Sequence, residues 1–155
     1  MEYLIEENRF DPAVKNGEGI GAMQFAAAGK HVDIVDYLLQ CNPNQVISEI
    51  SHSGFNSLHR AAISGSLDTI KLLLSTGGSQ DGPDLSVESK AHNGCSVLHL
   101  AAQYGNIEII QYLVEEFNAG INVQNDYSLT PLHFACIGCV TTDLILSTSD
   151  FITVP

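Results

Sequence analysis

The stretch from Asn93 to Glu115, NGCSVLHLAAQYGNIEIIQYLVE, most constrains the fold of this chain. A turn at Gly94 precedes a short helical pattern over residues 98–102, and Gly105 interrupts that pattern. A longer helical pattern follows, with apolar residues at the spacing of one helix face: Ile109, Ile110, Leu113 and Val114. Two short helices joined by a glycine turn cannot bury their apolar faces alone, so this unit needs similar neighbours.

The unit occurs four times along the chain. The histidine position of the short helix is occupied by Gln24, His59, His99 and His133, at intervals of 35, 40 and 34 residues. An apolar pair in the longer helix shows intervals of 34, 35 and 40 residues: Tyr3–Leu4, Tyr37–Leu38, Leu72–Leu73 and Tyr112–Leu113. The shared intervals follow in the same order, which indicates a true internal repeat and therefore a solenoid.

The start of each short helix carries a recognisable signature. Residues 130–135, TPLHFA, match the pattern T-P-L-H-x-A in full, residues 96–101 and 56–61 match it well, and residues 21–26 are a degenerate copy. Over almost its whole length the chain resembles the ankyrin-repeat family. The resemblance implies an all-α ankyrin-repeat solenoid of helix-turn-helix pairs with β-hairpin-like fingers. It does not imply one activity, because this family shares a scaffold.

The repeats predict a single elongated domain over 1–155 in which each unit contacts its neighbours. Its expected parts are an N-terminal half-repeat 1–15, repeat 1 at 16–50, repeat 2 at 51–90 with a loop insertion at 77–86, repeat 3 at 91–124 and a degenerate C-terminal repeat 125–155.

Both ends of the array depart from the pattern. Residues 2–7 align without gaps to residues 111–116, which favours either a half-repeat cap or a segment cut from a longer array. In the fourth repeat Asp143 replaces the apolar residue found at Ile109, so the second helix is expected to fail. That change suits a C-terminal cap and equally a lost or frayed helix.

Charge narrows the possible partners. The net charge is −12 with only six Lys and Arg, so phosphate backbones and anionic membranes are not expected partners. The acidic residues either solvate the outer helix faces or attract a basic segment of a partner protein.

Two other features bear on the cellular compartment of the protein. No apolar run is long enough for a membrane span, and MEYLIEENRF lacks the pattern of a signal peptide. Four cysteines show no disulfide framework, which favours the cytoplasm or the nucleus. We expect a monomer unless the chain is part of a longer array.

Potential catalytic groups have simpler structural explanations. His59, His99 and His133 lie one repeat apart and cannot meet at one ion, and the resemblance implies hydrogen bonding within and between hairpins. His133, Cys136 and Cys139 have ligand-like spacing, but steps of three residues spread side chains around a helix, and we expect buried thiols there. We predict no enzyme, no cofactor and no metal.

The expected binding surface follows from the resemblance. Ankyrin partners usually lie in a concave groove formed by the hairpin tips and the exposed side of the short helices. We expect Phe55, Ile63, Tyr104 and Tyr127 to make the main contacts, although such side chains can instead pack on neighbouring fingers. The full predicted set is His52, Ser53, Phe55, Ile63, Ser64, His92, Asn93, Cys95, Gln103, Tyr104, Asp126, Tyr127 and Leu129.

Three functions are compatible with this sequence. The first is a non-catalytic scaffold or adaptor that binds a partner polypeptide in the groove. The second is an inhibitor or regulatory subunit of an enzyme such as a kinase. The third is a slice of a longer architectural ankyrin array whose ends stack on further repeats.

Overall fold

The structure, a computed structural model, describes residues 11–41, 49–77 and 85–144, with side chains described as far as Gly138. Most of the expected N-terminal half-repeat, most of the insertion at 77–86 and the end of the C-terminal repeat therefore lie outside the described residues.

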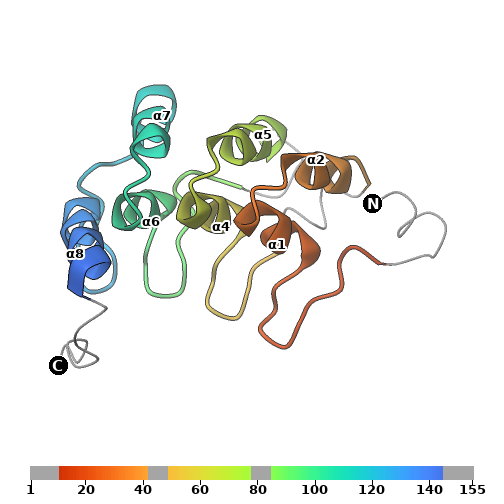
Figure 1. The fold of residues 1–155 in the computed structure, drawn as a ribbon, viewed down its shortest axis with the longest axis horizontal. Helices are drawn as coiled ribbons and strands as arrows, with labels where there is room; N and C mark the ends of the chain where they lie inside the picture. Colours follow the sequence, from red (N-terminus) through yellow and green to blue (C-terminus); the bar gives the residue numbers. More distant parts are fainter. Residues whose placement is uncertain (1–10, 42–48, 78–84, 145–155) are drawn as a thin grey trace.

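The described helices form three antiparallel pairs followed by one longer helix. Figure 1 shows two rows, with the short inner helices α1, α4 and α6 beside α8 and the outer helices α2, α5 and α7 in the second row. This arrangement confirms the predicted all-α stack of helix pairs. The bounds are α1 Ala22–Ala28, α2 Val32–Cys41, α4 Ser57–Ser64, α5 Leu67–Gly77, α6 Val97–Gln103, α7 Ile107–Phe117 and α8 Pro131–Leu144.

Each inner helix is preceded by a hairpin-like finger held by the same backbone hydrogen bond. The donor and acceptor are four residues apart in every finger: Asn16 N to Ile20 O, Ser51 N to Phe55 O, Ala91 N to Cys95 O and Asn125 N to Leu129 O. Backbone bonds also join successive fingers: His52 N to Glu18 O, His92 N to Ser53 O and Asp126 N to Asn93 O. The repeat period is thus built into the backbone itself.

The signature histidines cap the inner helices and join one repeat to the next. In α6 the backbone N–H of Ser96 donates to Nδ1 of His99, and Nε2 of His99 lies 3.0 Å from the carbonyl oxygen of Leu129 in the following finger. His59 repeats this arrangement with Asn56 on its own helix and with the carbonyl of Cys95, 3.3 Å away. Each histidine therefore satisfies polar groups of two neighbouring repeats.

The core lies between the two rows of helices. Its fully buried side chains come from both rows in every described pair: Met23, Val35, Leu38, Leu58, Ile70, Leu73, Val97, Ile109 and Leu113. The first repeat is less well capped than the others, because Gly21 precedes α1 without a side-chain cap and Gln24 replaces the histidine. Gln24 Nε2 still donates to the carbonyl of Glu49, so the bond to the next finger is kept.

The fourth inner helix does not stop where the others do. A residue with positive φ ends the inner helices of the first three repeats, namely Lys30, Gly65 and Gly105. Cys139 occupies the aligned position in the fourth repeat, and the backbone there continues as helix to Leu144. The left-handed turn is absent at Cys139, and one long helix replaces the helix-turn-helix unit of the other repeats.

One position near the end of each finger has a left-handed backbone in all four repeats. It is occupied by Gly19, Gly54, Gly94 and Ser128, and their φ angles are 75°, 81°, 74° and 59°. Only the serine pays the steric cost of a Cβ in this conformation.

We therefore expect Ser128→Gly to stabilise the protein by roughly 0.5 to 1 kcal/mol, after the added entropy of the unfolded chain is subtracted. Urea unfolding measures the difference. Ser128→Ala keeps the strained conformation and serves as the control, with little expected change. A Gly variant no more stable than the Ala variant would contradict the role assigned to this turn.

Candidate functional site

The inner-helix surface consists of the finger tips and the exposed side chains of α1, α4, α6 and α8. Of the residues predicted to bind a partner, Tyr104 at the end of α6 is 54% exposed and Tyr127 on the last finger is 71% exposed. The other tip residues, His52, Ser53, His92, Asn93 and Asp126, are exposed as well. Gln103, Ile63 and Leu129 are partly exposed.

Three predicted residues, Cys95, Ser64 and Phe55, serve the fold instead of presenting a free side chain. Cys95 is only 1% exposed, and Asn125 Nδ2 contacts its sulfur at 3.4 Å, so including its side chain in the binding surface was wrong. The Asn125 amide of the next finger lies against this thiol, so the position is not free for a partner. Ser64 donates to the carbonyls of Ala27 and Ala61.

Phe55 is half-buried and lies against the first turn of α4. Its ring stacks on His59 with centroids 5.5 Å apart, and the guanidinium of Arg60 lies over the Phe55 ring at 5.5 Å. Phe55 therefore acts first as a platform for its neighbours. Phe55 packs within the stack, which was the alternative expected for these aromatic side chains, and is not a free contact residue.

Sequence reasoning missed the residue that follows each signature histidine. This position holds Phe25, Arg60, Leu100 and Phe134 in the four repeats. Phe25 is 57% exposed, and Arg60 and Phe134 are partly exposed, whereas Leu100 is buried. The signal was present in the signature itself, because its variable x position lies one residue after the histidine, and in three of the four repeats that side chain is at least partly exposed.

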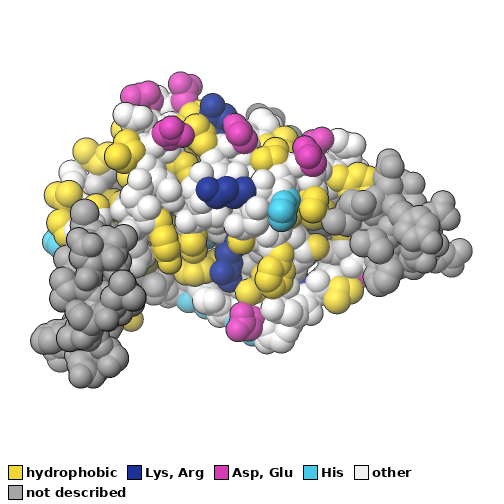
Figure 2. Space-filling view, in the orientation of Figure 1, with side chains coloured by type: hydrophobic (Ala, Val, Ile, Leu, Met, Phe, Trp, Pro, Cys, Tyr) yellow, Lys and Arg dark blue, Asp and Glu magenta, His cyan; other side chains and the backbone are white. Residues whose placement is uncertain are grey.

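Acidic side chains lie on the outer row of helices, whereas the inner row carries almost no charge. Figure 2 shows acidic side chains along the edge formed by α2, α5 and α7, and basic side chains near the middle of the same face. The acids of the outer row are Asp33, Asp36, Asp68, Glu108, Glu115 and Glu116. Within the described side chains of the inner helices, the single charged residue that the sequence supplies is Arg60.

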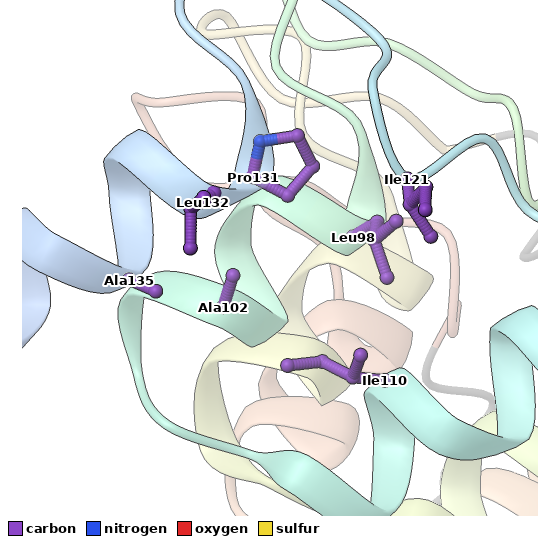
Figure 3. A pocket seen from close by; sticks show the side chains of 7 residues that line it. All are labelled: Leu98, Ala102, Ile110, Ile121, Pro131, Leu132 and Ala135. Carbon is purple, nitrogen blue, oxygen red and sulfur yellow. The ribbon is translucent and has the colours of Figure 1, made fainter.

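A second apolar surface lies at the C-terminal end of the stack. Figure 3 shows side chains from α6, α7, α8 and the loop after α7 around an open pocket. The pocket has a volume of about 220 Å³. Its lining residues are Leu98, Ala102, Ile110, Ile121, Pro131, Leu132 and Ala135. The pocket offers apolar contacts and no titratable group, so it suits an apolar side chain of another polypeptide.

Several pocket residues occupy positions that are core positions one repeat earlier. Leu132 is 72% exposed, whereas its counterpart Leu98 is 3% exposed. Ile121 is likewise exposed, and its counterpart Val87 is buried. Since no outer helix follows α8 within the described residues, the side chains that such a helix would cover face the open pocket.

One carboxylate is buried between the first and second repeats. Glu49 is 2% exposed, and neither of its carboxylate oxygens has a hydrogen-bond partner among the described residues. Burial raises the pKa of Glu49 to about 7, Lys15 opposes this shift and Asp11 adds to it. A Cβ at Gly21 would overlap the Glu49 carboxylate, so glycine at that position makes room for it.

The histidines and cysteines do not form a metal site in the described part of the chain. Burial lowers the pKa of His59 to about 4 and lowers the pKa of His99 below its ordinary value of 6.5, as expected for neutral structural histidines. Cys136 is exposed on the terminal helix, which corrects the expectation of a buried thiol there. The side chain of Cys139 lies outside the described residues, and no three potential ligands converge elsewhere among those that are described.

The buried carboxylate gives the protein a definite pH dependence. Because the folded-state pKa of Glu49 lies above its ordinary value of 4.5, the unfolded chain releases this proton first, and stability falls as pH rises from about 4.5 to about 7. We expect Glu49→Gln to gain roughly 1 to 3 kcal/mol relative to the wild type above this range.

Chemical denaturation of both proteins across this pH range measures the effect. His59 and His99 act in the opposite direction, since stability held by their neutral forms is lost as pH falls below 6.5. These histidines are present in both proteins, so their contribution cancels in the difference. A difference independent of pH would refute the proposed titration of Glu49.

Comparison with known proteins agrees with this geometry. The sequence profile described as ankyrin repeats (3 copies) matches residues 1–84 and 80–150. The comparison with curated proteins found no match. Within the described residues no helix combines the length and apolar character needed to cross a bilayer. The matched profile covers most of the chain and agrees with the stacked helix pairs and the capping histidines, so the chain belongs to the ankyrin-repeat family.

Proposed function

We propose that the chain is a non-catalytic interaction module that binds a partner polypeptide along its inner-helix surface. The main support is the exposure of two large aromatic side chains, Phe25 and Tyr104, which are 57% and 54% exposed beside the inner helices. Aromatic side chains in such positions often contribute much of the binding energy of protein interfaces. Its cysteines suit a reducing compartment, the cytoplasm or the nucleus.

The partner contacts two layers of this surface. The inner helices supply Phe25, Tyr104 and Ile137, which are apolar or amphipathic and exposed. The finger tips supply Tyr127 and mostly polar neighbours, including His52 and Asn93. This pattern of an apolar centre beside a polar margin is typical of interfaces that form between folded, soluble partners.

A second function is supported by the exposed core positions at the C-terminal end. The pocket between α7 and α8 is lined by side chains such as Leu132. The equivalent side chain one repeat earlier, Leu98, is buried. We propose that this end stacks on a further helical repeat unit, as in a longer architectural array. Both functions are compatible, because the pocket and the inner-helix surface use different residues.

The first function is tested at Tyr104 and Phe25. We expect Tyr104→Ala and Phe25→Ala each to weaken partner capture by roughly tenfold, since truncating one central aromatic contact removes 1 kcal/mol or more. Affinity capture with quantitative mass spectrometry compares each variant with the wild type. Glu116→Ala on the outer helix α7 is the control, and circular dichroism checks that helix content is retained. Equal capture by all four proteins would reject the inner-helix surface.

The second function is tested by a matched pair of leucines. In the isolated chain we expect Leu132→Ala to cost less than about 0.5 kcal/mol, because its side chain is exposed, and Leu98→Ala to cost roughly 2 to 4 kcal/mol. When an additional helix pair of the family's consensus sequence is fused after the chain, the cost of Leu132→Ala should approach that of Leu98→Ala. Urea unfolding gives both values. A cost at Leu132 that stays small in the fusion would contradict stacking at this end.

A further inference from the structure

We infer that the partner segment supplies a carboxylate to Arg60, with apolar or aromatic side chains on either side of it. This inference rests on the proposed binding at the inner-helix surface and adds the chemistry of the partner. It also revises the expectation of a basic partner segment, because the acidic residues that motivated it lie mainly on the outer helices.

Arg60 carries an isolated charge on the inner row of helices. The helix sequences AMQFAAA and VLHLAAQ, which lie on either side of α4, contain no charged residue. α4 itself, SLHRAAIS, contains one, Arg60. Because α4 packs against both neighbours, this guanidinium lies on a surface that offers it no carboxylate from the adjacent inner helices. An acidic group on a partner would complete the pair.

The guanidinium of Arg60 lies over an aromatic ring. Its Cζ lies 5.5 Å from the centre of the Phe55 ring, and that ring is in turn stacked on His59. The side chain is partly exposed, but its Nε is buried and has no hydrogen-bond acceptor among the described residues, so a carboxylate from outside would have to pair with the two terminal Nη groups. Stacking on an aromatic ring restricts the side chain before a ligand arrives, and a planar guanidinium binds a carboxylate through two parallel hydrogen bonds.

Apolar side chains occupy the positions equivalent to Arg60 in other repeats and the next turn of α4. Phe25 occupies the same position one repeat earlier, Phe134 occupies it two repeats later, and Ile63 is one turn further along α4. A ligand that covers these side chains removes water from around the pair, which strengthens an ion pair relative to one in open solvent. The same coverage favours apolar residues beside the acidic one.

The overall negative charge does not prevent this contact. The acids of the outer row lie on separate helices, and salt at physiological ionic strength screens exposed charges beyond about 8 Å. Their remaining repulsion disfavours highly acidic ligands. A single carboxylate among apolar residues therefore matches the surface better than an acidic tract or a basic segment.

A library of random short peptides displayed on phage tests the inference with the full chain as the target. We expect the selected peptides to carry Asp or Glu next to an aromatic or aliphatic residue. Their affinity, measured by fluorescence anisotropy with synthetic copies, should fall at least about tenfold on Arg60→Met and less on Arg60→Lys, which keeps the charge but not the planar fork. Replacing the peptide carboxylate by its amide should produce the same loss with the wild-type chain and little further loss with Arg60→Met.

The controls separate this inference from the proposed function. The selected peptides could contain no acidic residue, lose affinity on Tyr104→Ala and Phe25→Ala, and keep their affinity on Arg60→Met. This result would overturn the carboxylate inference and leave binding at the inner-helix surface intact. Peptides that ignore all these substitutions, or the failure to select any peptide, would count against that surface and therefore against both proposals. Circular dichroism of Arg60→Met and Arg60→Lys shows whether each variant keeps its fold.

Discussion

Contact between one repeat and the next is the interaction on which this structure depends. No helix pair here has a large enough core to be stable alone, and the apolar residues of α4, for example, are covered by α1 on one side and α6 on the other. The histidines fix the register of these contacts. His99 accepts a hydrogen bond from the backbone of its own helix start and reaches the carbonyl of Leu129 in the next finger. Burial keeps such a histidine neutral, as both bonds require.

Much of the fold could be predicted because it is encoded by local patterns that repeat. The capping position of His59, the glycine turns at Gly65 and Gly105 and the apolar spacing of the outer helices are all short-range signals. The exposed tyrosines at 104 and 127 could be located in the same way, since the repeat assigns each position a place in the unit.

The features that could not be predicted depend on contacts between residues of different repeats. Cys95 lies inside the finger because Asn125 of the next finger covers it, and Cys136 is exposed because nothing described packs beyond α8. The buried Glu49 could not be anticipated, since its environment is formed by residues of a different repeat, including Gly21. The role of Phe55 as a platform likewise required the position of Arg60.

The fingers are joined to one another through backbone atoms: a main-chain N–H of one tip donates to a main-chain carbonyl of the tip before it. Side chains such as His52, His92 and Asp126 take no part in those bonds. Substitutions at the tips can therefore accumulate with little effect on the architecture, and the residues that determine what is recognised can diverge independently of the residues that determine folding.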